Sequence, residues 1–292
     1  MRFLRFLVRE LLLHGIVFAV VGTFVLSFLY LVSTGSAPAD YMEAGKSFLL
    51  FISGHANSAT VGFTSGQIIK AGAIQTFVLS MISLAFVILI ALVCASYAVS
   101  SKYMAVHFAK KAGEKIEKIW SFLASILAAV PLFIGFWVAY ATFRNGVPFI
   151  IIALVTVILG GLSWDATNFL KTDMLSQVGQ THAIVFSTLG RNMGKFFPLP
   201  GTYSGYLFQS SLPRFIPYLA GKVPAIIGSV TIAEIAYSFP GLGSNLIDAL
   251  IATNTDLLVD SVFVLLCINA VVSFLVKTIL FLIYPRVYEK AI

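Results

Sequence analysis

The stretch that decides the fold is GAIQTFVLSMISLAFVILIALVCASYA, residues 72–98. It contains no Asp, Glu, Lys or Arg, and it exceeds the roughly 20 apolar residues that a helix needs to cross the hydrocarbon core of a bilayer. Because a bilayer holds no water to satisfy free backbone N–H and C=O groups, a segment of this kind must be helical. We therefore predict that residues 72–98 form a transmembrane helix.

The rest of the chain has the same character. Of its 292 residues, 59% are hydrophobic and 11% are charged, whereas soluble domains contain about 25% charged residues. Five further runs are long and apolar enough to span a bilayer, namely 11–33, 119–143, 147–165, 215–238 and 257–284. The first run is too long for the apolar region of a signal peptide, so we expect it to remain as an anchor. The composition predicts an all-α, polytopic membrane protein with six transmembrane helices in one domain, residues 1–292.

The basic residues predict the orientation of these helices. If the N-terminus is cytoplasmic, fourteen Lys and Arg residues fall in cytoplasmic segments and three fall outside, which are Lys46, Lys70 and Arg144. An excess of Lys and Arg in cytoplasmic loops is the usual pattern of membrane proteins. We therefore expect both termini in the cytoplasm. This topology also explains the net charge of +7, so no nucleic-acid partner is expected.

Two connecting segments have predicted roles. The external segment 34–71 contains a short apolar patch among small and polar residues, and we expect it to cap the outer mouth. The internal segment 166–214 is the longest connection, and long connections are usually functional or mobile. Within it, His182–Leu189 is predicted to form a short amphipathic helix, after which Gly190 lets the chain turn away. Such a helix would offer a docking surface to a soluble partner.

Catalytic and metal-binding patterns are absent from the sequence. It contains no GxxxxGK[ST] phosphate loop, no HExxH and no GxSxG motif. The four histidines are scattered, and the two cysteines, Cys94 and Cys267, lie in separate apolar runs without a CxxC pair. We therefore predict no catalytic residue, no metal site, no bound cofactor and no ATP site on this chain.

Lys222, Lys277 and Glu234 are ionisable residues inside predicted spans, where a charge is costly and is usually functional. Lys222 and Lys277 lie at a similar depth from the inner ends of the fifth and sixth spans. Either both side chains extend to the inner headgroups, or both line a water-filled path and attract an anionic group. Glu234 lies near the outer end of the fifth span. It has either a structural role, capping backbone N–H groups or pairing with a neighbour, or a role as a gate or helix-end anchor at the outer mouth.

The fifth span carries breaks that point to the same path. Pro224 and Gly228 should kink it, and kinked helices in a bundle line cavities more often than they face lipid. The span is followed by Pro240, Gly241, Leu242 and Gly243 on the outer side. We predict that Pro240 stops the helix and that the two glycines permit a tight re-entry of the chain.

Four stretches carry a family resemblance. The strongest is IAEIAYSFPGLGSNLIDALI, residues 232–251, and the others are MRFLRFLVRELLL at 1–13, the segment 60–86 that begins TVGFTSG, and the closing Tyr284-Pro285-Arg286. Together they resemble the permease (transmembrane) subunits of the oligopeptide/dipeptide/nickel class of ABC importers, and the resemblance covers nearly the whole chain. It implies a type I ABC importer permease-like fold.

The resemblance also implies partners and a site. In this family two homologous permease chains form the path, two cytoplasmic ATPase subunits hydrolyse ATP, and an extracytoplasmic substrate-binding protein delivers peptides or similar small solutes. The family belongs to the bacterial or archaeal cytoplasmic (inner) membrane. Its ATPases dock on a short "EAA" helix, which by position is Ala183–Gly190. The implied docking residues are His182, Ala183, Ile184, Val185, Phe186, Ser187, Thr188, Leu189 and Gly190.

Two other functions are weighed against this one. The stretch HAIVFSTLG, residues 182–190, lacks the basic and alanine pattern of the family's docking helix. This motivates the alternative that the chain is a permease-fold scaffold or accessory subunit without standard ATPase coupling. A self-sufficient secondary transporter would predict inverted repeats of helices, which we do not recognise in the sequence.

Overall fold

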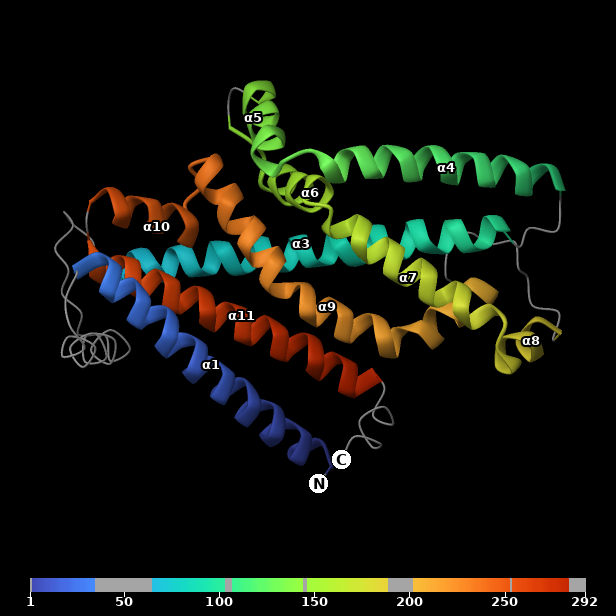
Figure 1. Ribbon diagram of the computed structural model, residues 1–292, viewed down its shortest axis with the longest axis horizontal. Coiled ribbons are helices and arrows are strands. Elements are labelled where there is room, and N and C mark those ends of the chain that lie inside the picture. Colours follow the sequence, from blue (N-terminus) through green and yellow to red (C-terminus); the bar gives the residue numbers. More distant parts are fainter. Residues whose placement is uncertain are drawn as a thin grey trace. The chain divides into compact units, whose positions relative to one another are not determined.

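All regular elements that the structure describes are helices. The computed structural model describes residues 2–34, 65–102, 107–143, 146–188, 202–252 and 254–283. The helices (Figure 1) are α1 (Arg2–Thr34), α3 (Ser65–Lys102), α4 (His107–Ala129), α5 (Leu132–Thr142), α6 (Phe149–Leu159), α7 (Leu162–Val178), α8 (Thr181–Thr188), α9 (Tyr203–Ala236), α10 (Leu242–Ile251) and α11 (Thr255–Ile283). The all-α class is therefore confirmed over these residues.

The described helices include three that are long and apolar enough to cross a membrane. They are Gln67–Ser101, Tyr203–Ala236 and Leu257–Ile279, and they coincide with the predicted spans at 72–98, 215–238 and 257–284. Two bent helix pairs raise the number to five if each pair counts as one span. These are the helices of a multi-pass membrane protein.

The first predicted span falls in α1, a single helix of 33 residues. Because the side chains of residues 25–34 lie outside the described part of the structure, the span at 11–33 and the six-helix arrangement remain predictions. Most of the predicted outer cap, 34–71, likewise lies outside the described residues, which resume at Ser65.

The two remaining predicted spans are each broken. Lys115–Ala129 and Leu132–Thr142 meet at a 94° bend, where Pro131 lacks a backbone N–H and cannot continue the helix. Phe149–Leu159 and Leu162–Val178 meet at 58°. Here Gly161 takes a φ of +71°, a conformation that costs a glycine little. The two runs are thus helical as predicted but are not straight.

The chain divides into two compact units, and α3, α9 and α11 each contribute residues to both. The first unit comprises residues 1–81 and 227–278, and the second comprises 82–226 and 279–292. In the first unit α1 and α11 run side by side (Figure 1), with the rings of Phe18 and Phe263 edge to face at 5.0 Å. This edge-to-face arrangement is the favoured geometry of an aromatic pair.

In the second unit α6 and α7 supply a close-packed core. α6 contacts α4, α5 and α7, and α7 also contacts α4 and α8. The buried residues of α7 include Ala166, Leu170 and Met174, all fully inaccessible and spaced four apart. This spacing places them on one face of the helix, so a single stripe of α7 forms its packing surface.

The predicted internal loop 166–214 is mostly helical. α7 continues to Val178, α8 occupies Thr181–Thr188, and α9 begins at Tyr203. α9 continues through Pro213, Pro217 and Pro224 without ending. A membrane helix tolerates internal prolines because neighbouring groups can satisfy the freed backbone carbonyls. The helix that contains the predicted span 215–238 therefore begins earlier than the span, at Tyr203.

Candidate functional site

Glu234 forms the centre of a buried polar cluster in the first unit. The residue lies near the end of α9 and is 0% exposed. Its Oε1 accepts a hydrogen bond of 2.7 Å from the Thr76 hydroxyl of α3, and its Oε2 accepts one of 2.8 Å from the Gly243 backbone N–H. Both carboxylate oxygens are therefore bonded to uncharged donors.

The same cluster satisfies the N-terminus of α10. The first N–H groups of a helix have no partner within the helix itself. Here the Thr76 hydroxyl accepts from the Leu242 N–H at 2.9 Å, while Glu234 accepts from the Gly243 N–H. A carboxylate at this position also interacts favourably with the positive end of the helix dipole. Side chains of α9 and α3 thus cap α10.

Three glycines bring the backbone close enough to form this cluster. A Cβ on Gly241 would lie 2.2 Å from the Glu234 carboxyl carbon, and one on Gly243 would lie 2.3 Å from the Thr231 carbonyl oxygen. A Cβ on Gly72 would lie 2.7 Å from Asn245 Nδ2. Gly241 has φ −134°, which any residue can adopt. These positions therefore need glycine because a side chain has no space there, and the tight re-entry of the chain stays a prediction.

α9 ends before the proline that was predicted to stop it. Its last residue is Ala236, and the chain then turns through Ser238, which has a φ of 50°. The Phe239 N–H donates to the Glu234 carbonyl at 2.9 Å, and the Ser238 N–H donates to Ile235 at 3.2 Å. These are the two bonds of a Schellman motif. The prediction that Pro240 stops the helix is wrong, because the left-handed Ser238 ends it first.

Lys222 is paired with an acid in the second unit. Its Nζ lies 2.8 Å from Asp165 Oδ2 of α7 and 5.6 Å from the centre of the Tyr218 ring. Tyr218 in turn stacks on Phe169 with ring centres 4.1 Å apart. The amine is thus held by a carboxylate and an aromatic face. Sequence reasoning missed Asp165 because it was assigned to the end of a span rather than to the first turn of α7.

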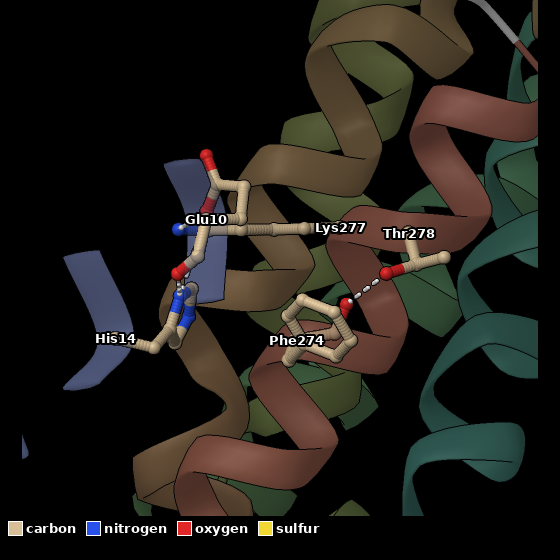
Figure 2. A network of polar contacts seen from close by, with 5 residues as sticks. All are labelled: Glu10, His14, Phe274, Lys277 and Thr278. Atoms are coloured by element: carbon tan, nitrogen blue, oxygen red, sulfur yellow. Dashed lines mark hydrogen bonds and ion pairs between the residues drawn. The ribbon is translucent and has the colours of Figure 1, made fainter. Parts of the chain in front are cut away.

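Lys277 is paired with an acid in the first unit. Figure 2 shows Glu10 and His14 on α1 facing Lys277 and Phe274 on α11. Lys277 Nζ lies 3.0 Å from Glu10 Oε2, and His14 Nδ1 lies 3.5 Å from the same oxygen. The His14 ring meets Phe274 edge to face. Each of the two predicted path lysines therefore has a carboxylate partner that no local sequence pattern indicates.

The other path candidates lie apart from these clusters. Pro224 and Gly228 are exposed on α9, and a Cβ on Gly228 would meet nothing within 4 Å. The second unit contains an apolar cavity of about 380 Å³ between α3, α4, α6 and α7, lined by Trp120 and Trp164 among others. None of the five predicted path residues lines this cavity.

α8 lies where the docking helix was predicted. Ala183 is fully buried, whereas Ile184 and Val185 are 53% and 54% exposed. Phe186 stacks on Tyr206 of α9 with ring centres 4.2 Å apart. The helix is thus seated against α9 and presents two adjacent apolar side chains outward. Leu189, Gly190 and the side chain of Ser187 lie outside the described residues.

α7 forms ion pairs with α4 and α9 that the sequence analysis did not predict. Lys171 pairs with Glu117 of α4, and Asp173 pairs with Arg214 of α9 at 2.9 Å. Among the described residues no group of three or more His, Cys, Asp or Glu side chains could hold a metal ion. The two ion pairs each join α7 to a neighbouring helix, α4 or α9.

Comparisons with known proteins give one local similarity. No family model matches the chain. A segment of 82 residues is 28% identical to the oligopeptide transport system permease protein AmiC in two strains of Streptococcus pneumoniae. The match covers 28% of this chain and 16% of each AmiC protein.

Proposed function

We propose that the chain is a transmembrane subunit of an ATP-driven ABC importer that moves peptides or similar small solutes across a bacterial or archaeal cytoplasmic membrane by alternating access. ATP hydrolysis takes place on two separate cytoplasmic ATPase subunits. A second permease chain completes the path, and an extracytoplasmic binding protein supplies the substrate. Support for the transport class comes from the local similarity to AmiC, which is a permease of an oligopeptide transport system, and from the apolar helices.

The observation that carries the coupling to an ATPase is the geometry of α8. A short helix can transmit a push only if it is fixed to the membrane helices and has an exposed surface for its partner. α8 has both properties, because Phe186 stacks on Tyr206 of α9 while Ile184 and Val185 remain exposed. The ion pair between Asp173 and Arg214 ties the flanking helices α7 and α9 together. Motion of α8 would therefore pass to both.

The proposed outer gate is the turn after α9. Pro240, Gly241, Leu242 and Gly243 connect α9 to α10, and Glu234 holds the start of α10 through the Gly243 N–H. Loss of that hydrogen bond would loosen the start of α10 from α9 and leave only the Thr76 hydroxyl of α3 to cap it, through the Leu242 N–H. In this proposal Glu234 is a gate or anchor residue, and no residue of this chain acts as a catalytic acid.

The test is retention of an ATPase. The chain is co-expressed with the ABC-importer ATPase subunits of its source organism and purified through a tag on the chain, and the ratio of ATPase to chain is measured. The double variant Ile184→Glu/Val185→Glu should lose the ATPase, since two charges replace the exposed apolar pair of α8. A matched control is Leu250→Glu/Ile251→Glu, which changes the exposed apolar pair of α10, 56% and 78% accessible. It should retain the ATPase.

The alternative function makes the opposite prediction. If the unaltered chain purifies as a folded protein without a stoichiometric ATPase, the importer proposal fails. The permease-fold scaffold or accessory subunit would then be favoured. If both double variants lose the ATPase equally, α8 is not the docking helix.

A further inference from the structure

The apolar cavity of the second unit has the size of a ligand site. It lies between α3, α4, α6 and α7 and has a volume of about 380 Å³. Protein interiors are closely packed and contain few voids larger than a water molecule, whereas pockets for small ligands measure roughly 300–1,000 Å³. The cavity is therefore too large to be an ordinary packing defect.

The lining of the cavity is suited to an apolar ligand. No charged side chain is among the described residues that form it. Its two hydroxyl groups are already used within the protein, because Ser163 donates to the Val157 carbonyl at 3.1 Å and Thr167 donates to the Ser163 carbonyl at 2.7 Å. A charged group or a peptide backbone placed here would lose its water without gaining a matching set of partners. The lining therefore favours a hydrocarbon.

Two contacts between α4 and α7 mark the ends of the cavity. At one end Lys171 pairs with Glu117, one helical turn beyond the last lining residue of each helix. At the other end Gly161 approaches Ala128, and a Cβ on the glycine would lie 3.4 Å from the alanine Cβ. At 1.5 Å per residue, Gly161 and Lys171 are about 15 Å apart along α7. The cavity is thus an elongated space between two helices that are joined at both of its ends.

The cavity opens between α3 and α4. Leu89 and Val93 of α3 and Trp120 of α4 line it, and they are 50%, 41% and 46% exposed. Thr167 of α7 also lines it and is 4% exposed, so α7 forms the floor. The two residues of α3 lie within Gln67–Ser101, which is long and apolar enough to cross a membrane. At this depth a membrane-spanning α3 turns the opening toward hydrocarbon.

We propose that the cavity holds one acyl chain of a membrane phospholipid, which enters between α3 and α4. The hydrocarbon core of a bilayer is roughly 30 Å thick, so the chains of one leaflet extend over about 15 Å. This length equals the distance between the two contacts that bound the cavity. The uncharged lining binds the chain and makes no selection for a headgroup. The proposal requires that the second unit lie in a membrane, and it does not depend on ATP-driven transport.

The experiment uses the three tryptophans of the chain, Trp120, Trp137 and Trp164. Trp120→Phe/Trp137→Phe leaves Trp164, which lines the cavity, as the only tryptophan. The full chain is reconstituted, with any partner chains that accompany it, in phosphatidylcholine vesicles with ordinary or brominated acyl chains. Bromine quenches the fluorescence of a tryptophan that it contacts. A variant with all three tryptophans replaced by Phe gives the background from partner chains.

The emission of Trp164 should fall about twofold or more in the brominated vesicles, because a chain in the cavity lies in van der Waals contact with the indole. Brominated phosphatidylglycerol should quench it to the same extent, since no described lining residue is charged.

Filling the cavity should protect Trp164. Ala124→Phe places a ring in the cavity from α4 and should reduce the quenching by about half, because closely packed groups cannot share one space. Ala129→Phe is the matched control on the same helix, since Ala129 is exposed and lies outside the lining. It should leave the quenching unchanged. Cys94→Phe fills the cavity from α3 and keeps the test decisive if Ala124→Phe does not fold.

A second control reports general contact with lipid. Trp120→Phe/Trp164→Phe leaves only Trp137, which is 71% exposed on α5 and does not line the cavity. Its quenching by brominated lipid should be the same with and without Ala124→Phe.

Three results would overturn the proposal. The first is the absence of Trp164 quenching in brominated vesicles, which is expected if a protein segment covers the opening. The second is unchanged quenching in folded Ala124→Phe and Cys94→Phe. The third is an equal loss of quenching in Ala129→Phe, which would mean that a ring on α4 acts without filling the cavity.

Discussion

Glu234 and Glu10 are two buried glutamates of the same unit, and they are satisfied in opposite ways. Glu234 is 0% exposed and bonds to a hydroxyl and a backbone N–H. Glu10 is 8% exposed and bonds to the amine of Lys277. Both tie together segments that are distant in the sequence, but only Glu10 has a cation as its partner.

The difference determines what each glutamate contributes. Glu234 accepts from a backbone N–H and from a hydroxyl of α3, so its loss leaves the Gly243 N–H and the Thr76 hydroxyl without an acceptor. Glu10 belongs to an ion pair, and an ion pair can often be replaced as a whole by apolar groups of similar volume. We therefore expect every substitution of Glu234 to lower the stability, while the Glu10 pair should tolerate a matched double substitution.

The largest expected effect is that of Gly243→Ala. The added Cβ would lie 2.3 Å from the Thr231 carbonyl oxygen, a backbone atom that cannot move aside. We expect the free energy of unfolding to fall by about 3 kcal/mol, or the protein not to fold. The measurement is the monodisperse fraction that remains after heating in detergent. Gly228→Ala is the control, because nothing lies within 4 Å of its Cβ, and it should be neutral or slightly stabilising. Equal behaviour of the two variants would contradict the close approach.

Removal of the Glu234 carboxylate should have the next largest effect. Glu234→Ala leaves the Gly243 N–H and the Thr76 hydroxyl without their acceptor, which should cost about 2–3 kcal/mol. Glu234→Gln keeps one acceptor oxygen and should cost about 1 kcal/mol. Thermal unfolding in detergent distinguishes them. A Glu234→Ala protein as stable as the unaltered chain would show that the cluster does not anchor α10.

The Glu10 pair should behave differently in a double-mutant cycle. Lys277→Met leaves the buried Glu10 without its cation and should cost about 1–2 kcal/mol, a value reduced because Lys277 is 34% exposed. Adding Glu10→Gln should restore most of that stability. The coupling energy comes from the unfolding midpoints of the four proteins. Strictly additive effects would mean that the pair contributes nothing as a pair.

The smallest expected effect is a gain in stability. Ser238 has a φ of 50° at the end of α9, and a glycine avoids the steric cost of this conformation. Ser238→Gly should therefore raise stability by about 1 kcal/mol. Ser210→Gly is the matched control within α9 and should lower stability by a similar amount. The same shift in both variants would contradict the Schellman geometry.

Much of the fold was predictable because it follows from local chemistry. Residues 72–98 are apolar for longer than a membrane is thick, so the helix Gln67–Ser101 was expected. A short helix at His182–Leu189 was expected from alternating apolar residues before a glycine, and α8 is found at Thr181–Thr188. The helix breaks at Pro131 and Gly161 also have a local cause, because proline and glycine interrupt helices. The prediction of spans from hydropathy alone did not take these two residues into account.

By itself, the sequence determined the all-α membrane class, the positions of the long helices and the presence of Glu234 beside a glycine-rich turn. Only the tertiary structure decided what those residues touch. Thr76 and Glu234 are 158 positions apart, and Glu10 and Lys277 are 267 apart. No local period links such pairs, because their contact depends on which helix faces pack together. The sequence indicated that the glycines after α9 form a turn. Only the structure shows that they also leave room for the buried carboxylate of Glu234.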